Sequence, residues 1–141
     1  NLAEQLKLPV ENHLVEGGSP LPRTKFYVPG SVLSVAVDAT QPLGYGMREA
    51  TDVFFDASPV FRLAPGAAAQ GVTAVAWFNS KAPLRSGWAW GQEYLDRGVA
   101  AVDVPLGTGH VVLYGPQITQ RAQPHGTFKF LFNAIDRASA R

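Results

Sequence analysis

The most polar stretch of the chain lies between its last predicted strand and its last predicted helix. It holds Gln117, Arg121 and His125, with Gln120 and Gln123 among them. Ligands of open α/β sheets bind beyond the carboxyl ends of the strands, and the N-terminus of a following helix adds amide dipoles that favour an anion. Gln117, Arg121 and His125 are therefore our candidates for ligand binding. We weigh them against a solvated loop whose Arg and His only cap or bridge, which is the interpretation we favour.

A metal site is the second kind of chemistry to consider. His13 and Glu16 have the spacing by which two side chains on one helical turn bind zinc, and His110 or His125 could be a third ligand. The segment around His13 is rich in glycine and proline and offers no general base, so we interpret it as a solvated loop. We expect no metal and no cofactor in this chain.

Motifs for covalent catalysis and nucleotide binding are missing from the sequence. The chain has no cysteine, which excludes a Cys nucleophile, thiolate zinc sites, iron–sulfur clusters and disulfides. No Gly-x-Ser-x-Gly string is present to expose a serine nucleophile. The strings at 44–46 (GYG) and 107–109 (GTG) lack the third glycine of a dinucleotide fingerprint and indicate turns. We expect no catalytic residue.

Aromatic residues are concentrated in one part of the sequence, at Trp77, Trp88, Trp90 and Tyr94. They could stack on sugar rings or on an aromatic ligand. We prefer core or interface packing, because aromatic side chains dominate buried contacts in both settings.

The elements that must position these residues are mainly strands. Apolar alternation or continuous apolar runs predict strands over residues 31–37, 53–55, 60–63 and 72–78, and a hairpin of 99–104 with 110–114. Both alternating sets of 72–78 are apolar, which is typical of a central strand covered on both faces. The hairpin turn requires Gly107 or Gly109 to adopt a positive φ.

Two helices are predicted, one at each end of the chain. Asn1 can cap a short helix that carries Leu2 and Leu6 on one face and ends at Pro9. We therefore expect residues 1–30 to form a short helix and an irregular loop, and residues 31–141 to form a single α/β domain. In the last segment Phe128, Leu131, Phe132 and Ile135 have the spacing of one helix face, with Thr127 as its cap; we expect this face to pack on the sheet.

Together these elements predict an α/β fold with a small mixed sheet, a C-terminal β-hairpin and an amphipathic helix. Parallel strands need long helical crossovers, and few are predicted here. The sheet therefore looks incomplete, and we expect missing sequence or another chain to cover part of it.

Charge and hydropathy exclude two classes of partner. Twelve Lys and Arg residues oppose eleven Asp and Glu, and the resulting net charge of +1 argues against nucleic acid and membrane surfaces. No apolar run approaches the roughly 20 residues that cross a bilayer. The chain begins with Asn1 rather than Met, so we expect a processed product, a designed chain or a part of something longer.

Several strings of the sequence resemble one known family. They are residues 41–47 (QPLGYGM), 53–55, 87–95 (GWAWGQEYL), 99–115 and 125–134 (HGTFKFLFNA), so the resemblance covers most of 26–134. The chain resembles the C-terminal tail of large bacterial proteins related to carboxypeptidase A-type zinc metallopeptidases. In that family the tail follows the peptidase domain and is similar to a class I glutamine amidotransferase domain, which has a flavodoxin-like fold.

The resemblance implies a domain without chemistry of its own. Zinc ligands and the catalytic Glu of the peptidase would lie upstream of Asn1. An active amidotransferase would need a Cys nucleophile and a His-x-Glu pair after the hairpin, where this chain has 116–118 (PQI). The implied partner is the upstream peptidase domain of the same protein, and the implied location is the periplasm or the cell exterior.

Three functions are compatible with the sequence. The preferred one is a non-catalytic accessory domain that packs against the peptidase domain, stabilises it or presents substrate to it. The second is a ligand-binding module that uses Arg121 and His125 for an anionic or amide-bearing ligand, and the third is an unrecognised hydrolase. If part of the protein is missing, we expect the chain to self-associate or to expose an apolar patch beside the central strand or the tryptophans.

Overall fold

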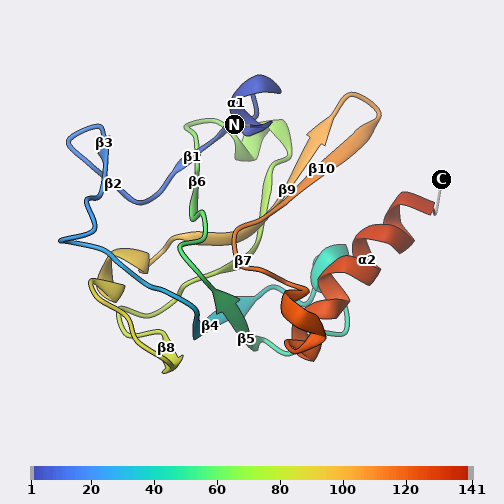
Figure 1. The fold of residues 1–141 in the computed structure, drawn as a ribbon. Coiled ribbons are helices and arrows are strands. Elements are labelled where there is room, and N and C mark those ends of the chain that lie inside the picture. Colours follow the sequence, from blue (N-terminus) through green and yellow to red (C-terminus); the bar gives the residue numbers. More distant parts are fainter. Residues whose placement is uncertain (1, 140–141) are drawn as a thin grey trace.

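A computed structural model describes residues 2–139 as one antiparallel sheet with a C-terminal helix packed against it (Figure 1). The strands follow the order β1-β6-β9-β7-β4-β5, with β10 paired to β9 and β8 paired to β4. The strands are β1 (Val10–Asn12), β4 (Ser31–Val37), β5 (Ala50–Phe55), β6 (Phe61–Leu63), β7 (Thr73–Trp77), β8 (Leu84–Ser86), β9 (Val99–Leu106) and β10 (Gly109–Tyr114). Two α-helices and five short 3-10 turns complete it: α1 (Leu2–Gln5), α2 (Phe128–Ser139), η1 (Pro42–Gly44), η2 (Ala68–Gln70), η3 (Gln92–Leu95), η4 (Gln120–Ala122) and η5 (His125–Thr127).

The prediction of a small mixed sheet is wrong, although the α/β class is confirmed. The sheet has eight strands, and every strand pair within residues 2–139 is antiparallel. Antiparallel neighbours can be joined by short connections, whereas parallel ones need a long crossover that this chain does not provide between its strands. The rule that places ligands beyond the carboxyl ends of parallel strands therefore gives no support to the loop at 117–125.

The irregular loop expected within residues 1–30 is also corrected. Residues 10–12 pair with β6 and thus belong to the main sheet. Two further short strands, β2 (Val15–Glu16) and β3 (Ser19–Pro20), form a hairpin around Gly17 and Gly18. Both glycines have positive φ, +57° and +82°, which allows the two-residue turn that the Gly-Gly dipeptide favours. The predicted cap at Asn1 lies outside the described residues.

The predicted strands are confirmed, with one change in which of them is most deeply buried. Along β4, Leu33, Val35 and Val37 are buried while their neighbours are half-buried, as the alternation predicts. β7 lies between β9 and β4, but the longest buried run is on β9, where residues 99–104 are all buried. In the β9–β10 hairpin Gly107 has a φ of +59°, whereas Gly109 does not have a positive φ.

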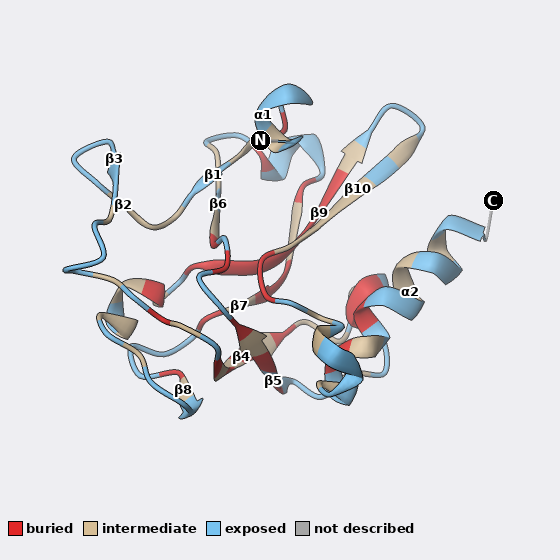
Figure 2. Ribbon diagram, in the orientation of Figure 1, coloured by how far each residue is buried: buried red, intermediate tan, exposed pale blue. Residues whose placement is uncertain are grey.

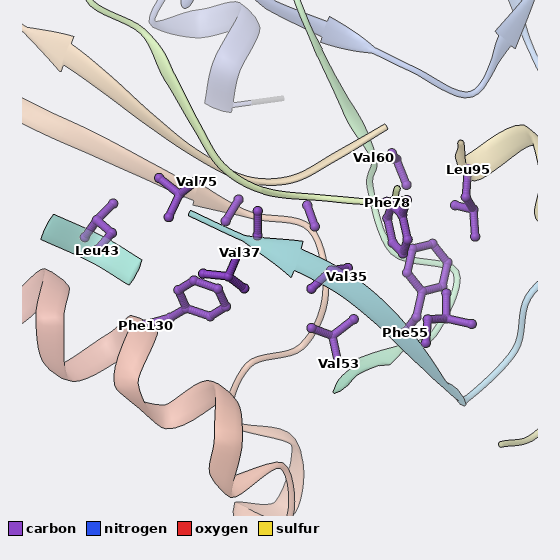
Figure 3. Close-up of a cluster of buried hydrophobic side chains, with 14 of the residues drawn as sticks. Val35, Val37, Leu43, Val53, Phe55, Val60, Val75, Phe78, Leu95 and Phe130 are labelled. Carbon is purple, nitrogen blue, oxygen red and sulfur yellow. The ribbon is translucent and has the colours of Figure 1, made fainter. Parts of the chain in front are cut away.

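Two apolar clusters pack on the two faces of β9 and β10. Figure 2 shows much of β9 in the colour of buried residues. β10 contributes Val112 and Tyr114 to one cluster and Val111 and Leu113 to the other, as expected for a strand with packing on both sides. The larger cluster contains Phe130 from α2, which points toward Val37 in Figure 3. Residues of this chain therefore cover both faces of β9 and β10.

The face of α2 predicted to pack on the sheet points away from it. Leu131, Phe132 and Ile135 are 37%, 61% and 57% exposed, whereas Phe130 is only 2% exposed. Apolar side chains lie on two sides of the helix. The sequence pattern predicts that the side with more of them is buried, whereas it is Phe130, on the other side, that packs on the sheet. We call Leu131, Phe132 and Ile135 the outer face of α2.

Thr127 is not the predicted N-cap of α2. Its hydroxyl donates to the carbonyl oxygens of Ile118 and Pro124, at 2.6 and 2.8 Å, instead of accepting a bond from the helix. The 3-10 turn η5 (His125–Thr127) runs directly into α2, so the helical path starts one turn earlier in the chain than the predicted cap. Thr127 is fully buried and ties the start of the helix to the preceding loop.

Candidate functional site: a basic groove at the start of helix α2

One hollow of about 680 Å³ gathers most of the chemistry-bearing side chains near α2. Five of its lining residues are ionisable: Arg48, Asp52, Arg85, His125 and Lys129. They come from the segment before β5, from β5 itself, from β8, and from η5 and α2. We call this hollow the basic groove.

The sheet supplies the floor of the basic groove. In the β4–β5 pair Ser34 lies opposite Asp52, and both belong to the sets that alternate with the buried positions of their strands. Arg85 lies on β8, which pairs with β4 on the other side. Its guanidinium lies 3.3 Å from the Asp52 carboxylate. Both side chains are more than half exposed, so this ion pair contributes little to stability.

The wall of the basic groove is built around a glycine. Gly46 has a φ of +70°, and a Cβ atom placed on it would lie 2.7 Å from the Nζ atom of Lys129. The Lys129 ammonium therefore rests against bare backbone at a position that favours glycine. His125 stacks on Phe128 with a ring separation of 5.3 Å.

The basic groove carries more positive charge than the whole chain. Arg48, Arg85 and Lys129 oppose the single carboxylate of Asp52, whereas the chain as a whole has a net charge of +1. Within residues 2–139, neither Arg48 nor Lys129 has an ion-pair partner. The groove thus presents unpaired cations to solvent.

Of the three predicted ligand-binding residues, the structure brings only His125 into the groove. Gln117 is exposed, and its backbone N–H donates to the Phe54 carbonyl oxygen at 3.0 Å. Arg121 is exposed on η4 with a φ of +46° and does not line the groove. The sequence pattern missed Arg48, Arg85 and Lys129, because each is an ordinary surface cation until strand pairing and the packing of α2 bring the three together.

The predicted metal ligands lie in different places. His13 has its Nε2 atom 3.1 Å from the backbone oxygen of Asp96, and Glu16 forms an ion pair with Lys25. His110 contacts Asp103, and His125 lies in the basic groove. Among residues 2–139, no three His, Asp or Glu side chains are close enough to hold a metal ion together.

A second charged cluster joins the end of α2 to the β9–β10 hairpin. Asp103 is buried on β9, and its Oδ1 atom lies 3.0 Å from Nδ1 of His110 on β10. Arg137, in the last turn of α2, binds the other carboxylate oxygen. An Asp within the apolar run 99–104 is the signal in the sequence that could have identified this cluster, because a buried carboxylate requires partners.

Tyr114 lies next to this charged cluster and should make the fold sensitive to alkaline pH. Its hydroxyl donates to the Phe130 carbonyl oxygen at 2.8 Å, and burial, with a contribution from Asp103, raises its pKa to about 12. The pKa of tyrosine in the unfolded chain is about 10. The neutral phenol therefore stabilises the fold below pH 10, and this contribution, on the order of 2 kcal/mol, is lost as the pH rises through 12.

Urea denaturation at several pH values between 9 and 12 measures this effect. Tyr114→Phe should be less stable than the wild type at pH 9, and the difference should shrink as the pH approaches 12. Tyr45→Phe, at a site that is 74% exposed, is the control and should follow the wild type throughout. A difference between Tyr114→Phe and the wild type that stays constant with pH would contradict the prediction.

The aromatic concentration is only partly buried. Trp88 and Trp90 are 53% and 54% exposed, as expected for an exposed patch beside the tryptophans, whereas Trp77 is half-buried on β7. Trp90 exchanges two backbone hydrogen bonds with Tyr27, and its indole N–H donates to the Thr24 carbonyl oxygen at 2.9 Å. Core packing, one of the two settings preferred from the sequence, is therefore wrong for Trp88 and Trp90, and packing in an interface stays a prediction.

A second hollow, of about 910 Å³, lies under the N-terminal segment and is lined mainly by apolar side chains. Tyr27 lines it and also makes an edge-to-face contact with Trp88 at 6.0 Å, so this hollow adjoins the exposed tryptophans. It contains no cluster of cations comparable to the basic groove.

Comparisons with known proteins add no relative to this description. No protein-family model, curated protein or solved structure matches the chain. Among residues 2–139, neither α-helix has the length and apolar character needed to cross a bilayer.

Proposed function

We propose that the chain is a non-catalytic accessory domain of a zinc carboxypeptidase-like hydrolase, placed after the peptidase domain and acting in the periplasm or outside the cell. In this proposal zinc and the catalytic residues belong to the upstream domain, and this chain is the part of the protein whose sequence resembles class I glutamine amidotransferase domains. The antiparallel sheet of residues 2–139 differs from the parallel sheet of the flavodoxin-like fold that the resemblance implies. Its role is to pack against the peptidase domain, to stabilise it or to present substrate to it. The family resemblance of residues 26–134 motivates the proposal.

The observation that carries the proposal is the outer face of α2. Leu131, Phe132 and Ile135 form an apolar strip on a helix whose opposite side already fills the core through Phe130. Figure 2 shows the outward turns of α2 in the colour of exposed residues. Burying one such side chain completely stabilises a complex by about 1.5–3 kcal/mol, so three of them provide a strong reason for a partner surface.

The partner proposed for this face is the upstream peptidase domain of the same protein. A domain that is joined covalently binds at high effective concentration, so a strip of three side chains can hold it in place without a large interface. Isolated surface apolar residues need no explanation, whereas contiguous apolar surface is a common feature of interaction sites.

Cysteine labelling provides the test, because the chain has no cysteine of its own. We would introduce Phe132→Cys on the outer face, and Lys81→Cys on an exposed turn as the matched control. The labelling rate would be measured by peptide mass spectrometry, in the chain alone and in the longer protein with its upstream peptidase domain. We expect the thiol at position 132 to react freely in the chain alone and at least about tenfold more slowly in the longer protein, with position 81 unchanged.

Two outcomes would contradict the proposal. Equal labelling at position 132 in both proteins would show that the peptidase domain does not cover the outer face. Protection in the chain alone that grows with protein concentration, together with a dimer in sedimentation, would identify a second copy of the chain as the occupant.

A further inference from the structure

We propose that the basic groove binds a small organic anion through a phosphate or carboxylate group. This inference concerns a different surface from the outer face of α2 and does not depend on the accessory role.

The cations of the basic groove are the first reason. Arg48, Arg85 and Lys129 converge on one hollow, and within residues 2–139 only Arg85 has an acidic partner, at 3.3 Å from Asp52. Placing like charges together costs free energy unless an anion lies between them. Guanidinium groups bind phosphate and carboxylate through paired hydrogen bonds, whereas the Lys129 ammonium acts as a point charge.

The construction of the wall is the second reason. Gly46, with its φ of +70°, leaves the space that the Lys129 ammonium occupies, since a side chain there would displace it. His125 also lines the hollow, and its ring contacts that of Phe128. Residues of η5 and the first turn of α2 line the same hollow.

The size and lining of the groove set the class of ligand. A volume of about 680 Å³ is in the range of small-molecule sites and exceeds what an inorganic ion needs. Met47, Ala50 and Pro124 supply apolar surface next to the cations. The ligand therefore has a small organic body in addition to its charged group. Asp52 disfavours a second anionic group at the Arg85 end.

An NMR titration of the 141-residue chain tests this inference. Phenyl phosphate and benzoate are the two probes, each combining one anionic group with a small organic body, and sodium chloride at equal ionic strength is the reference. We expect saturable amide shifts at residues 46–52 and 124–129 with at least one probe. Tighter binding of phenyl phosphate would identify a phosphate ligand, and tighter binding of benzoate would identify a carboxylate ligand.

Substitutions on two separate elements show whether the groove itself is responsible. Lys129→Gln and Arg48→Gln should each weaken binding of the preferred probe at least about fivefold, because each removes a charge-assisted contact. Lys129→Arg keeps the charge and should stay within about twofold of the wild type. Lys81→Gln removes an exposed cation outside the groove and should also have an effect below about twofold.

Three results would overturn the inference. The first is the absence of saturable shifts in the groove with both probes. The second is full binding in both Lys129→Gln and Arg48→Gln, with circular dichroism confirming that they are folded. The third is an equal loss in Lys81→Gln, because the overall charge of the chain would then explain the binding.

Discussion

Replacing Phe55 by alanine should destabilise the chain by about 3–5 kcal/mol, the usual cost of removing a large aromatic side chain from a core. Phe55 is 0% exposed on β5 and makes edge contacts with Phe26 and Phe78, at ring separations of 6.4 and 6.1 Å. Figure 3 shows its ring next to that of Phe78 in the larger cluster. Phe78 directly follows β7, and Phe26 lies in the segment before β4. Because these segments hold both rings in place, the rings cannot easily move to fill the cavity that the alanine leaves.

Phe132→Ala is the matched control for Phe55→Ala. The two substitutions remove the same atoms, but Phe132 is 61% exposed on the outer face of α2. Exposed substitutions of this kind change stability by about 0.5 kcal/mol or less. Urea denaturation of both variants gives the comparison, and domains of this size have a total stability of about 5–15 kcal/mol. Equal losses would mean that the outer face is part of the core of the isolated chain.

Strand β4 and helix α2 show when an apolar sequence pattern predicts the buried face of an element and when it does not. Along β4 only one alternating set is strongly apolar, so Leu33, Val35 and Val37 could be assigned to the core correctly. Along α2 both sides are apolar, and the pattern favours the longer set over Phe130, which the sheet buries. Periodicity gives the orientation of an element only when one face is clearly polar.

Strand pairing could not be predicted from the same patterns. β5 and β6 follow each other in the chain, yet β5 pairs with β4 and β6 pairs with β1 and β9. β5 and β6 were both predicted as strands, but the partners of each depend on long-range contacts that have no local signal. The mixed sheet was predicted from one strand that is apolar on both sides, without information on which strands pair.

The basic groove was only partly visible for the same reason. His125 was a candidate because it lies in a polar stretch before a helix. Arg48, Arg85 and Lys129 lie in three separate segments of the chain. The pairing of β5 and β8 with β4, together with the packing of η5 and α2 beside β5, brings them to one hollow. A site assembled by register, without a contiguous motif, cannot be read from a single sequence.

Replacing Gly91 by alanine should lower the free energy of unfolding by at least about 3 kcal/mol, because two backbone segments approach each other closely at this position. Gly91 has a φ of +71°, and a Cβ atom on it would lie 2.0 Å from the carbonyl oxygen of Lys25. The obstacle is backbone, so no side-chain rotation relieves it. The next residue back, Trp90, pairs with Tyr27 through two backbone hydrogen bonds, and the alanine must push these segments apart.

Gly66→Ala separates this steric cost from the cost of the backbone conformation. Gly66 has a similar φ of +79°, but a Cβ atom there would meet nothing within 4 Å. Its substitution should cost only about 1–2 kcal/mol, the penalty of a side chain in the left-handed region. Thermal unfolding of both variants measures the difference, and tryptophan fluorescence should change in Gly91→Ala alone, because its clash lies beside Trp90. Equal destabilisation of the two variants would show that the segments at 25–27 and 88–91 separate without cost, and that the exposed tryptophans are not held rigidly at the surface.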